Sequence, residues 1–439
     1  MKNIGFILFM ATTLLIGMGS YGVSEAVDTA KQDPLIEILI KKGILTEEEA
    51  VDIKQEAEAL EKQSQQEIVK EIEDKELAVP KALKGLKVGM LAYLDYSNGQ
   101  KPEPDDNSSS FNEFRVTRGY LTVQKEILPW MHARATIDAH QDETGDYKNR
   151  LKYFYAELRP PDLGLLTDMK SEIGLGHIPW LDFEEHINPY RCQGTMAIER
   201  AGTFNSADKG VSLRGYFGGK LEDAEEKTGS HYYDSHYGSW HLGVYDGSGY
   251  HASEENNNKA VEGRLTLRPL PDVIPGLQMS YFGIYGEGNK EASNGDYPDY
   301  EVNLGMLSYE HPCLTLTAQY FQTEGNAKGK WVDAEGDALE TEGYSFFGNF
   351  KLPVLDRKLS LFARYDYFDQ DKDDAVGEDT DYNMFFGGLA WDVYKHNLLL
   401  LAYETTDYGD DAGKKGEIPI VDNNLGDDHR IQAVWQISF

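Results

Sequence analysis

The sequence predicts an all-β fold, a transmembrane antiparallel β-barrel of about 16 strands, preceded by a short α-helical segment. The final strand, 430–439, alternates apolar and polar residues up to a C-terminal Phe, which is the period of a strand with two different faces. Connections along the chain alternate between short and long, as in a barrel with turns at one end and loops at the other. The mean hydropathy of −0.53 agrees, because every second residue of such a strand is polar.

Residues 1–26 have the pattern of a secretory signal peptide. Lys2 is followed by an apolar run from Ile4 to Met18, and Ser24 and Ala26 provide small residues at the spacing that signal peptidase prefers. A retained anchor is the alternative interpretation. No later stretch approaches the roughly 20 apolar residues that a spanning helix requires.

Residues 27–80 have helical periodicity. The segment 46–49, Thr-Glu-Glu-Glu, is a capping-box signature, and Ala50, Ile53, Ala57 and Leu60 continue at coiled-coil spacing. Two interpretations remain open: a short coiled coil that gathers chains or reaches towards the cell wall, and an amphipathic hairpin packed under the barrel. Because this segment precedes the first strand, we expect it on the periplasmic side.

Residues 84–439 alternate strands with connections, the first strand being 87–96. Clear two-residue alternation runs through 131–140, 211–217, 261–268 and 359–367. Strands with one apolar and one polar face also occur in β-sandwiches. The lengths of the connections therefore distinguish a barrel from a sandwich. The long polar segments are 97–111, 177–207, 246–258, 286–299, 325–341, 370–381 and 406–428. The segment 221–239 is a long connection on the short-turn side, which leaves room for a strand count that differs by two.

Composition excludes several classes of function. The net charge of −33 argues against a nucleic-acid partner, since phosphates are held by Lys and Arg. It suits the surface of a Gram-negative cell, where divalent cations bridge acidic loops and lipopolysaccharide. Cys192 and Cys313 are too few for a disulfide scaffold, and we expect them unbridged at opposite barrel ends. Without a metal-binding, nucleotide-binding or catalytic motif, we expect no enzyme activity, cofactor or metal.

Six stretches resemble the phosphate-selective porin O and P family. They are 114–121 (FRVTRGYL), 174–179 (GLGHIP), 197–200 (AIER), 210–215 (GVSLRG), 244–249 (VYDGSG) and 263–265 (GRL). The resemblance implies a trimeric outer-membrane channel of sixteen strands, contacting lipid and lipopolysaccharide, whose third long loop folds inward. That loop would be 177–207, and its constriction residues would be Trp180, Asp182, Glu184, Glu185, His186, Tyr190 and Arg191.

Two interpretations of the lumen remain open. We expect these arginines to face the lumen: Arg118, Arg134, Arg214, Arg264, Arg268, Arg364 and Arg430. A ladder of unpaired guanidinium groups would pass an oxyanion such as phosphate from site to site. Alternatively, Asp138, Glu262 and Asp366 on the same faces neutralise these arginines and brace the wall. The excess of 75 Asp and Glu over 42 Lys and Arg opposes an anion pathway.

The resemblance implies passive diffusion of small hydrophilic solutes or ions across the outer membrane. The alternative is a structural protein whose barrel is an anchor, tethered to the envelope through residues 27–80.

Overall fold

The computed structural model describes residues 42–43, 46, 83–142 and 144–439. The chain divides into two units, 1–84 and 85–439. The expected signal peptide at 1–26 lies outside the described residues, as does the helical segment 27–80 apart from residues 42–43 and 46. Among the described residues, no helix has both the length and the apolar character needed to cross a membrane.

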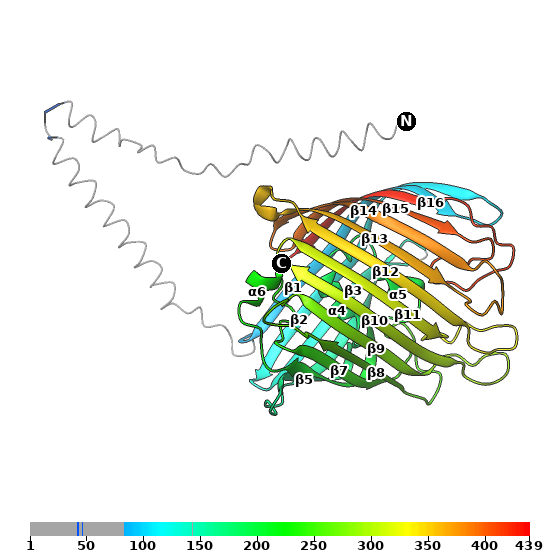
Figure 1. Cartoon of the computed structure of the whole chain (residues 1–439), viewed down its shortest axis with the longest axis horizontal. Coiled ribbons are helices and arrows are strands. Elements are labelled where there is room, and N and C mark those ends of the chain that lie inside the picture. The colour runs from blue at the N-terminus through cyan, green and yellow to red at the C-terminus, as the bar shows by residue number, and fades with distance from the viewer. Residues whose placement is uncertain (1–41, 44–45, 47–82, 143) are drawn as a thin grey trace. The chain divides into compact units, whose positions relative to one another are not determined.

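The second unit is a closed antiparallel barrel of 16 strands, as the sequence predicts (Figure 1). Each strand pairs with its neighbours in the chain, and β1 pairs with β16 to close the ring. The strands are β1 (Leu86–Pro102), β2 (Ser108–Leu128), β3 (Met131–Gln141), β4 (Tyr147–Leu158), β5 (Leu166–His177), β6 (Ala207–Phe217), β7 (Gly238–Tyr245), β8 (Ala260–Leu267), β9 (Leu277–Glu287), β10 (Asp299–His311), β11 (Leu314–Glu324), β12 (Glu340–Lys351), β13 (Leu359–Asp369), β14 (Asp381–Tyr394), β15 (Asn397–Tyr408) and β16 (Asp428–Ser438).

Connections alternate between the two ends of the barrel. The turn end, where the C-terminus lies, holds turns such as 312–313 and 395–396; the loop end holds long loops, among them L3 (178–206), L4 (246–259) and L8 (409–427). The expected long segment at 97–111 is wrong. β1 and β2 stay paired through Gly99 and Phe111, leaving only 103–107 as a loop, because polar residues on both faces hide the strands in the sequence.

The outer face of the barrel is apolar and exposed. On β8, the side chains of Val261 and Leu265 are 55% and 44% exposed on the outer face. The inner face of the same strand buries the alternate residues, Glu262, Arg264 and Thr266. The alternation predicted at 261–268 is therefore confirmed, with the apolar side outward as a lipid-facing wall requires. Cys192 in L3 and Cys313 in the turn 312–313 are both free, at opposite ends as expected.

The inside of the barrel contains a hydrophobic core, which differs from the polar lumen that the alternation predicts. L3 folds into the barrel with two short helices, α4 (Leu181–Ile187) and α5 (Ala197–Ala201) (Figure 1). Its Trp180 stacks on Phe282 of β9 at 5.5 Å, and its Tyr190 packs on Phe362 of β13 at 4.4 Å between ring centroids. The inner faces of β9–β16 combine apolar side chains, which join this core, with buried polar side chains.

Two smaller helices lie in turn-end connections. α6 (Ala224–Thr228) belongs to the connection between β6 and β7, and the 3-10 helix η1 (Leu355–Arg357) belongs to the one between β12 and β13. The first of these connections, residues 218–237, is hereafter T3. It is the long link that the sequence placed at 221–239 on the short-turn side, and it adds no strand to the sixteen.

Candidate pore constriction

L3 is anchored to the barrel wall by its buried side chains. The Trp180 indole donates to the Glu184 carboxylate at 2.6 Å, and Gln319 of β11 donates to the same carboxylate at 3.1 Å. Tyr190 donates its hydroxyl to Asn349 of β12 at 3.0 Å. The structure thus places Trp180, Glu184 and Tyr190 in the contact between L3 and the wall, whereas the sequence assigned them to the constriction.

The buried Glu184 makes stability depend on pH. Burial raises the pKa of Glu184 from 4.5 to about 7, although Arg364 and the Trp180 indole oppose the shift. The folded state therefore holds this proton more tightly than the unfolded chain, so the contribution of Glu184 to stability falls as pH rises from about 4.5 to about 7. The shift corresponds to roughly 3 kcal/mol. Glu184→Gln is expected to remove this component, which unfolding midpoints at pH 5 and pH 8 would test; equal pH dependence in both proteins would contradict it.

The lumen-facing side of L3 carries acidic residues. Side chains of Asp182, Glu185 and His186 are 27%, 24% and 30% exposed. Burial raises the pKa of Asp182, but His186, His177 and Arg214 outweigh this effect and hold it well below its usual range. Asp182 is therefore an anion at neutral pH. Arg191 is buried and forms ion pairs with Glu185 and Glu199, so it braces L3 internally.

A basic wall, Arg118, Arg134, Arg150 and Lys152, lies on the inner face of β2–β4. Asp138 accepts from Arg118 at 3.2 Å and from Arg150 at 3.0 Å. Among the described residues, Arg134 and Lys152 form no ion pair with a carboxylate. Electrostatic interaction between Arg134 and Asp182 links this wall to L3. Of the four cations on this wall, two share the Asp138 carboxylate and two have no paired carboxylate in the part of the chain that the structure describes, so positive charge is in excess.

Tyrosines hold the cations of the basic wall in place. The Lys152 ammonium lies 4.5 Å from the centre of the Tyr120 ring and donates to its hydroxyl at 3.1 Å. The Arg134 guanidinium lies 4.7 Å from the Tyr153 ring, and that of Arg150 lies 5.2 Å from the Tyr250 ring of L4. An aromatic face attracts a cation but carries no net charge. The tyrosines therefore fix these cations without neutralising them.

Two β-bulges build the basic wall. Between β3 and β4, Thr136 pairs with Tyr153 and Ile137 with Leu151, so Lys152 is an extra residue. Lys152 and Tyr153 are both buried on the inside because a bulge disrupts the two-residue alternation. A second register shift lies between β1 and β2, where Tyr93 pairs with Arg118 and Leu94 with Val116. Because of it, Arg115 and Arg118 both face the lumen. Strict alternation places Arg115 and Arg118 on opposite faces, which is why the sequence missed Arg115.

The other predicted arginines mostly brace the barrel. Arg214 pairs with Glu172 at 2.8 Å, and Arg364 pairs with Asp366 at 2.7 Å. Arg264 is 2% exposed and donates to the Pro179 carbonyl at 3.0 Å, so it holds the start of L3.

Two further residues differ from their expected roles. Arg268 is buried and donates to carbonyls of T3 rather than facing the pore. Glu262 is buried and forms no ion pair within residues 83–142 and 144–439, so the expectation that it neutralises an arginine is wrong.

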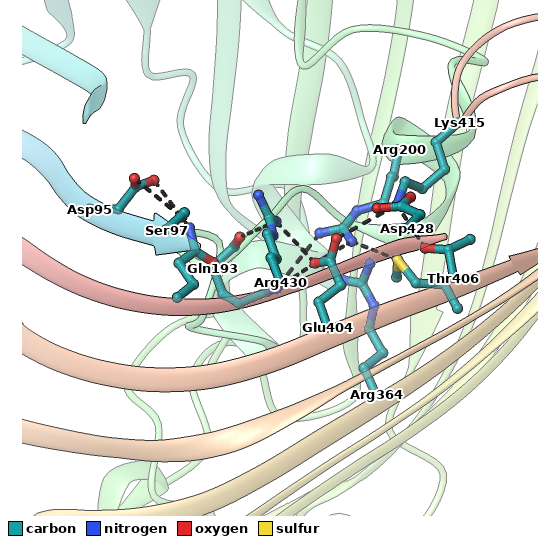
Figure 2. A network of polar contacts seen from close by, with 12 residues as sticks. Asp95, Ser97, Gln193, Arg200, Arg364, Glu404, Thr406, Lys415, Asp428 and Arg430 are labelled. Atoms are coloured by element: carbon teal, nitrogen blue, oxygen red, sulfur yellow. Dashed lines mark hydrogen bonds and ion pairs between the residues drawn. The ribbon is translucent and has the colours of Figure 1, made fainter. Parts of the chain in front are cut away.

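A second cluster lies where β15 and β16 meet L3 and L8 (Figure 2). Glu404 accepts from Arg200 at 3.0 Å, from Arg430 at 3.0 Å and from Gln193 at 2.6 Å, and the Lys415 ammonium is 3.6 Å away. A polar cavity of about 340 Å³ opens beside it. The sequence predicted only Arg430 here. Arg200 lies in the resembling stretch 197–200, but no pattern brings it together with Glu404 and Lys415.

Comparison with known proteins identifies the fold. No protein-family model and no curated protein sequence matches the chain. The solved structure of an anion-selective porin from Comamonas acidovorans superposes with a TM-score of 0.54 at 10% identity, covering 80% of this chain and 99% of that one. Salmonella typhi OmpF in complex with daunomycin gives 0.53 at 10% identity, covering 81% and 97%.

The outer-membrane channel DcaP of Acinetobacter baumannii gives a TM-score of 0.50 at 12% identity, covering 81% of this chain and 98% of that chain. At such low sequence identity, the structural similarity shows only the fold. The chain has the sixteen-stranded barrel fold of outer-membrane porins.

Proposed function

We propose that this protein is an outer-membrane channel for passive diffusion of small hydrophilic solutes, with a preference for anions at its constriction. The observation that carries the proposal is the basic wall, in which Arg134 and Lys152 are held by neutral tyrosine rings and, within residues 83–142 and 144–439, not by carboxylates. An ion pathway needs charges that remain available to the solute, and carboxylate-paired arginines do not provide them.

Charges on the two sides of the constriction differ in sign. The basic wall has an excess of positive charge, whereas L3 brings the Asp182 carboxylate within electrostatic reach of Arg134 on this wall. The net charge of −33 does not decide selectivity, since charges beyond roughly 8 Å are screened at physiological salt. An anion passing the constriction is attracted to the basic wall, and local charge favours it over a cation.

Oxyanions, phosphate among them, suit this wall because guanidinium groups bind two oxygens at once. The resemblance further supports a homotrimer in the outer membrane of a Gram-negative cell. There the exposed apolar outer face meets lipid and lipopolysaccharide, residues 1–26 are removed as a signal peptide and residues 27–80 are periplasmic.

Planar bilayers test the proposal. With the purified protein under a KCl gradient, we expect ion-conducting channels whose reversal potential is displaced towards that of chloride. A reversal potential displaced towards that of potassium would overturn the anion preference but not the channel function. Absence of conductance from a correctly folded barrel would overturn the channel itself.

A structural anchor is the second candidate, because L3 and T3 occupy part of the lumen. In that case, deleting residues 27–80 abolishes attachment of the barrel to the cell envelope, measured by co-sedimentation with cell-wall material. A channel instead keeps its conductance after this deletion.

A further inference from the structure

T3 folds inward instead of forming a tight turn. Its Leu221, Thr228 and Ser235 are 5%, 5% and 0% exposed. At Gly229, a methyl group would lie 2.8 Å from the Cα of Pro312, in the turn between β10 and β11. T3 therefore leaves the rim at β6 and reaches strands that are not its neighbours, passing the turn between β8 and β9. Figure 1 shows α6 at the turn end.

The inner tip of T3 contacts the constriction loop. The Tyr233 hydroxyl donates to the Asp182 carboxylate at 2.5 Å, and its ring meets the Phe183 ring edge to face at 5.0 Å. Next to it, the Tyr232 ring lies 4.1 Å from that of His186. All three contacted residues belong to α4 of L3. T3 thus supports α4 from the turn end.

Residues of β8 and its following turn hold this tip in place. The Arg264 guanidinium lies 5.1 Å from the Tyr233 ring. Arg268 donates to the carbonyls of Ser235 at 3.1 Å and Tyr233 at 3.4 Å. Tyr233 has a φ of 48°, a left-handed conformation that strains a residue with a large side chain. Such strain persists where surrounding contacts enforce it, which indicates that the position of Tyr233 is strongly determined.

We propose that T3 is a second constriction element and that Tyr233 is a positioning residue, which fixes the Asp182 carboxylate opposite the basic wall. The inference rests on the proposed channel function. Asp182 also lies 3.5 Å from Arg214 and interacts with Arg134. Without the Tyr233 hydroxyl, the carboxylate turns towards these cations and neutralises more of their charge.

A Tyr233→Phe variant tests this positioning role. Phe retains the ring that packs on Phe183 and removes only the hydrogen bond, so T3 stays folded. The anion preference, measured as reversal potential in a KCl gradient, is expected to fall. Tyr232→Phe is the matched control, because the Tyr232 side chain is exposed and contacts L3 through its ring; it is expected to keep the reversal potential of the parent.

A double-mutant cycle separates positioning from general loosening. If Tyr233 acts through Asp182, then Tyr233→Phe has no further effect on selectivity in an Asp182→Asn background. Equal effects in both backgrounds would overturn the positioning role.

Shortening T3 tests its role as a constriction element. Replacing residues 219–236 by Asn-Gly, a favoured two-residue hairpin turn, is expected to raise single-channel conductance. Unchanged conductance in a folded shortened barrel would overturn the second constriction. If the shortened barrel does not fold, the Tyr233→Phe result and its cycle decide the inference. A parent protein that never conducts would instead overturn the channel function.

Discussion

Replacing Arg134 with Gln is expected to move the reversal potential in a KCl gradient towards that of potassium. Arg134 is fixed against the Tyr153 ring and forms no carboxylate ion pair among the described residues, so its charge acts directly on passing ions. At about 4 Å in water, a unit charge contributes about 1 kcal/mol, or roughly a fivefold change in local anion concentration. The effect is expected to weaken as salt concentration rises, because screening shortens the range of the charge.

Lys148→Gln is the matched control, since it removes the same charge near the loop end of β4. Lys148 is exposed and pairs with Asp142, so its loss is expected to leave selectivity nearly unchanged. If Arg134→Gln and Lys148→Gln shift the reversal potential equally, the selectivity arises from general charge at the mouth and the basic wall has no special role.

Glu404→Gln is expected to destabilise the barrel by roughly 3–5 kcal/mol, because it leaves partly buried cations without their shared anion. Arg200, Arg430 and Lys415 converge on this carboxylate from L3, β16 and L8. The amide retains one acceptor oxygen but no charge, so Arg200 and Arg430 lose their carboxylate partner, whereas Lys415 keeps Asp428 at 2.7 Å. The shift of the guanidinium unfolding midpoint in detergent micelles measures this loss.

A carboxylate near the barrel rim provides the comparison. Glu113 pairs with Lys101 at 3.6 Å and Arg115 at 3.5 Å, but its side chain is 38% exposed. Glu113→Gln is expected to cost about 1 kcal/mol or less, as for other solvent-exposed pairs. Similar losses for both variants would mean that the Glu404 cluster is hydrated and does not hold L3 and L8 to the wall.

The barrel itself could be predicted because lipid imposes a strict pattern. An outer face of alternate apolar residues and an alternation of turn and loop lengths predict about sixteen strands, and the predicted last strand at 430–439 corresponds to Asp428–Ser438. L3 was placed at 177–207 and lies at 178–206. These features depend on local periodicity, which one sequence contains.

The constriction could be predicted only in part, because its geometry depends on single-residue irregularities and distant contacts. Arg134 and Asp138 were identified by alternation, but the bulge at Lys152 carries no pattern of its own. The inward fold of T3 depends on packing between Tyr233 and α4, residues far apart in the chain. Lys415 lies in a long loop whose path only the folded structure reveals.

The hydrophobic core inside the barrel has a consequence for how the chain reaches its final state. Strands β9–β16 are apolar on their outer faces and contribute many apolar side chains to the inner core, so before the ring closes they expose extensive apolar surface to water. Segments of this kind aggregate when exposed. The acidic loops, which contribute to the net charge of −33, oppose that association by mutual repulsion. The same loops therefore serve the unassembled chain as solubilising segments.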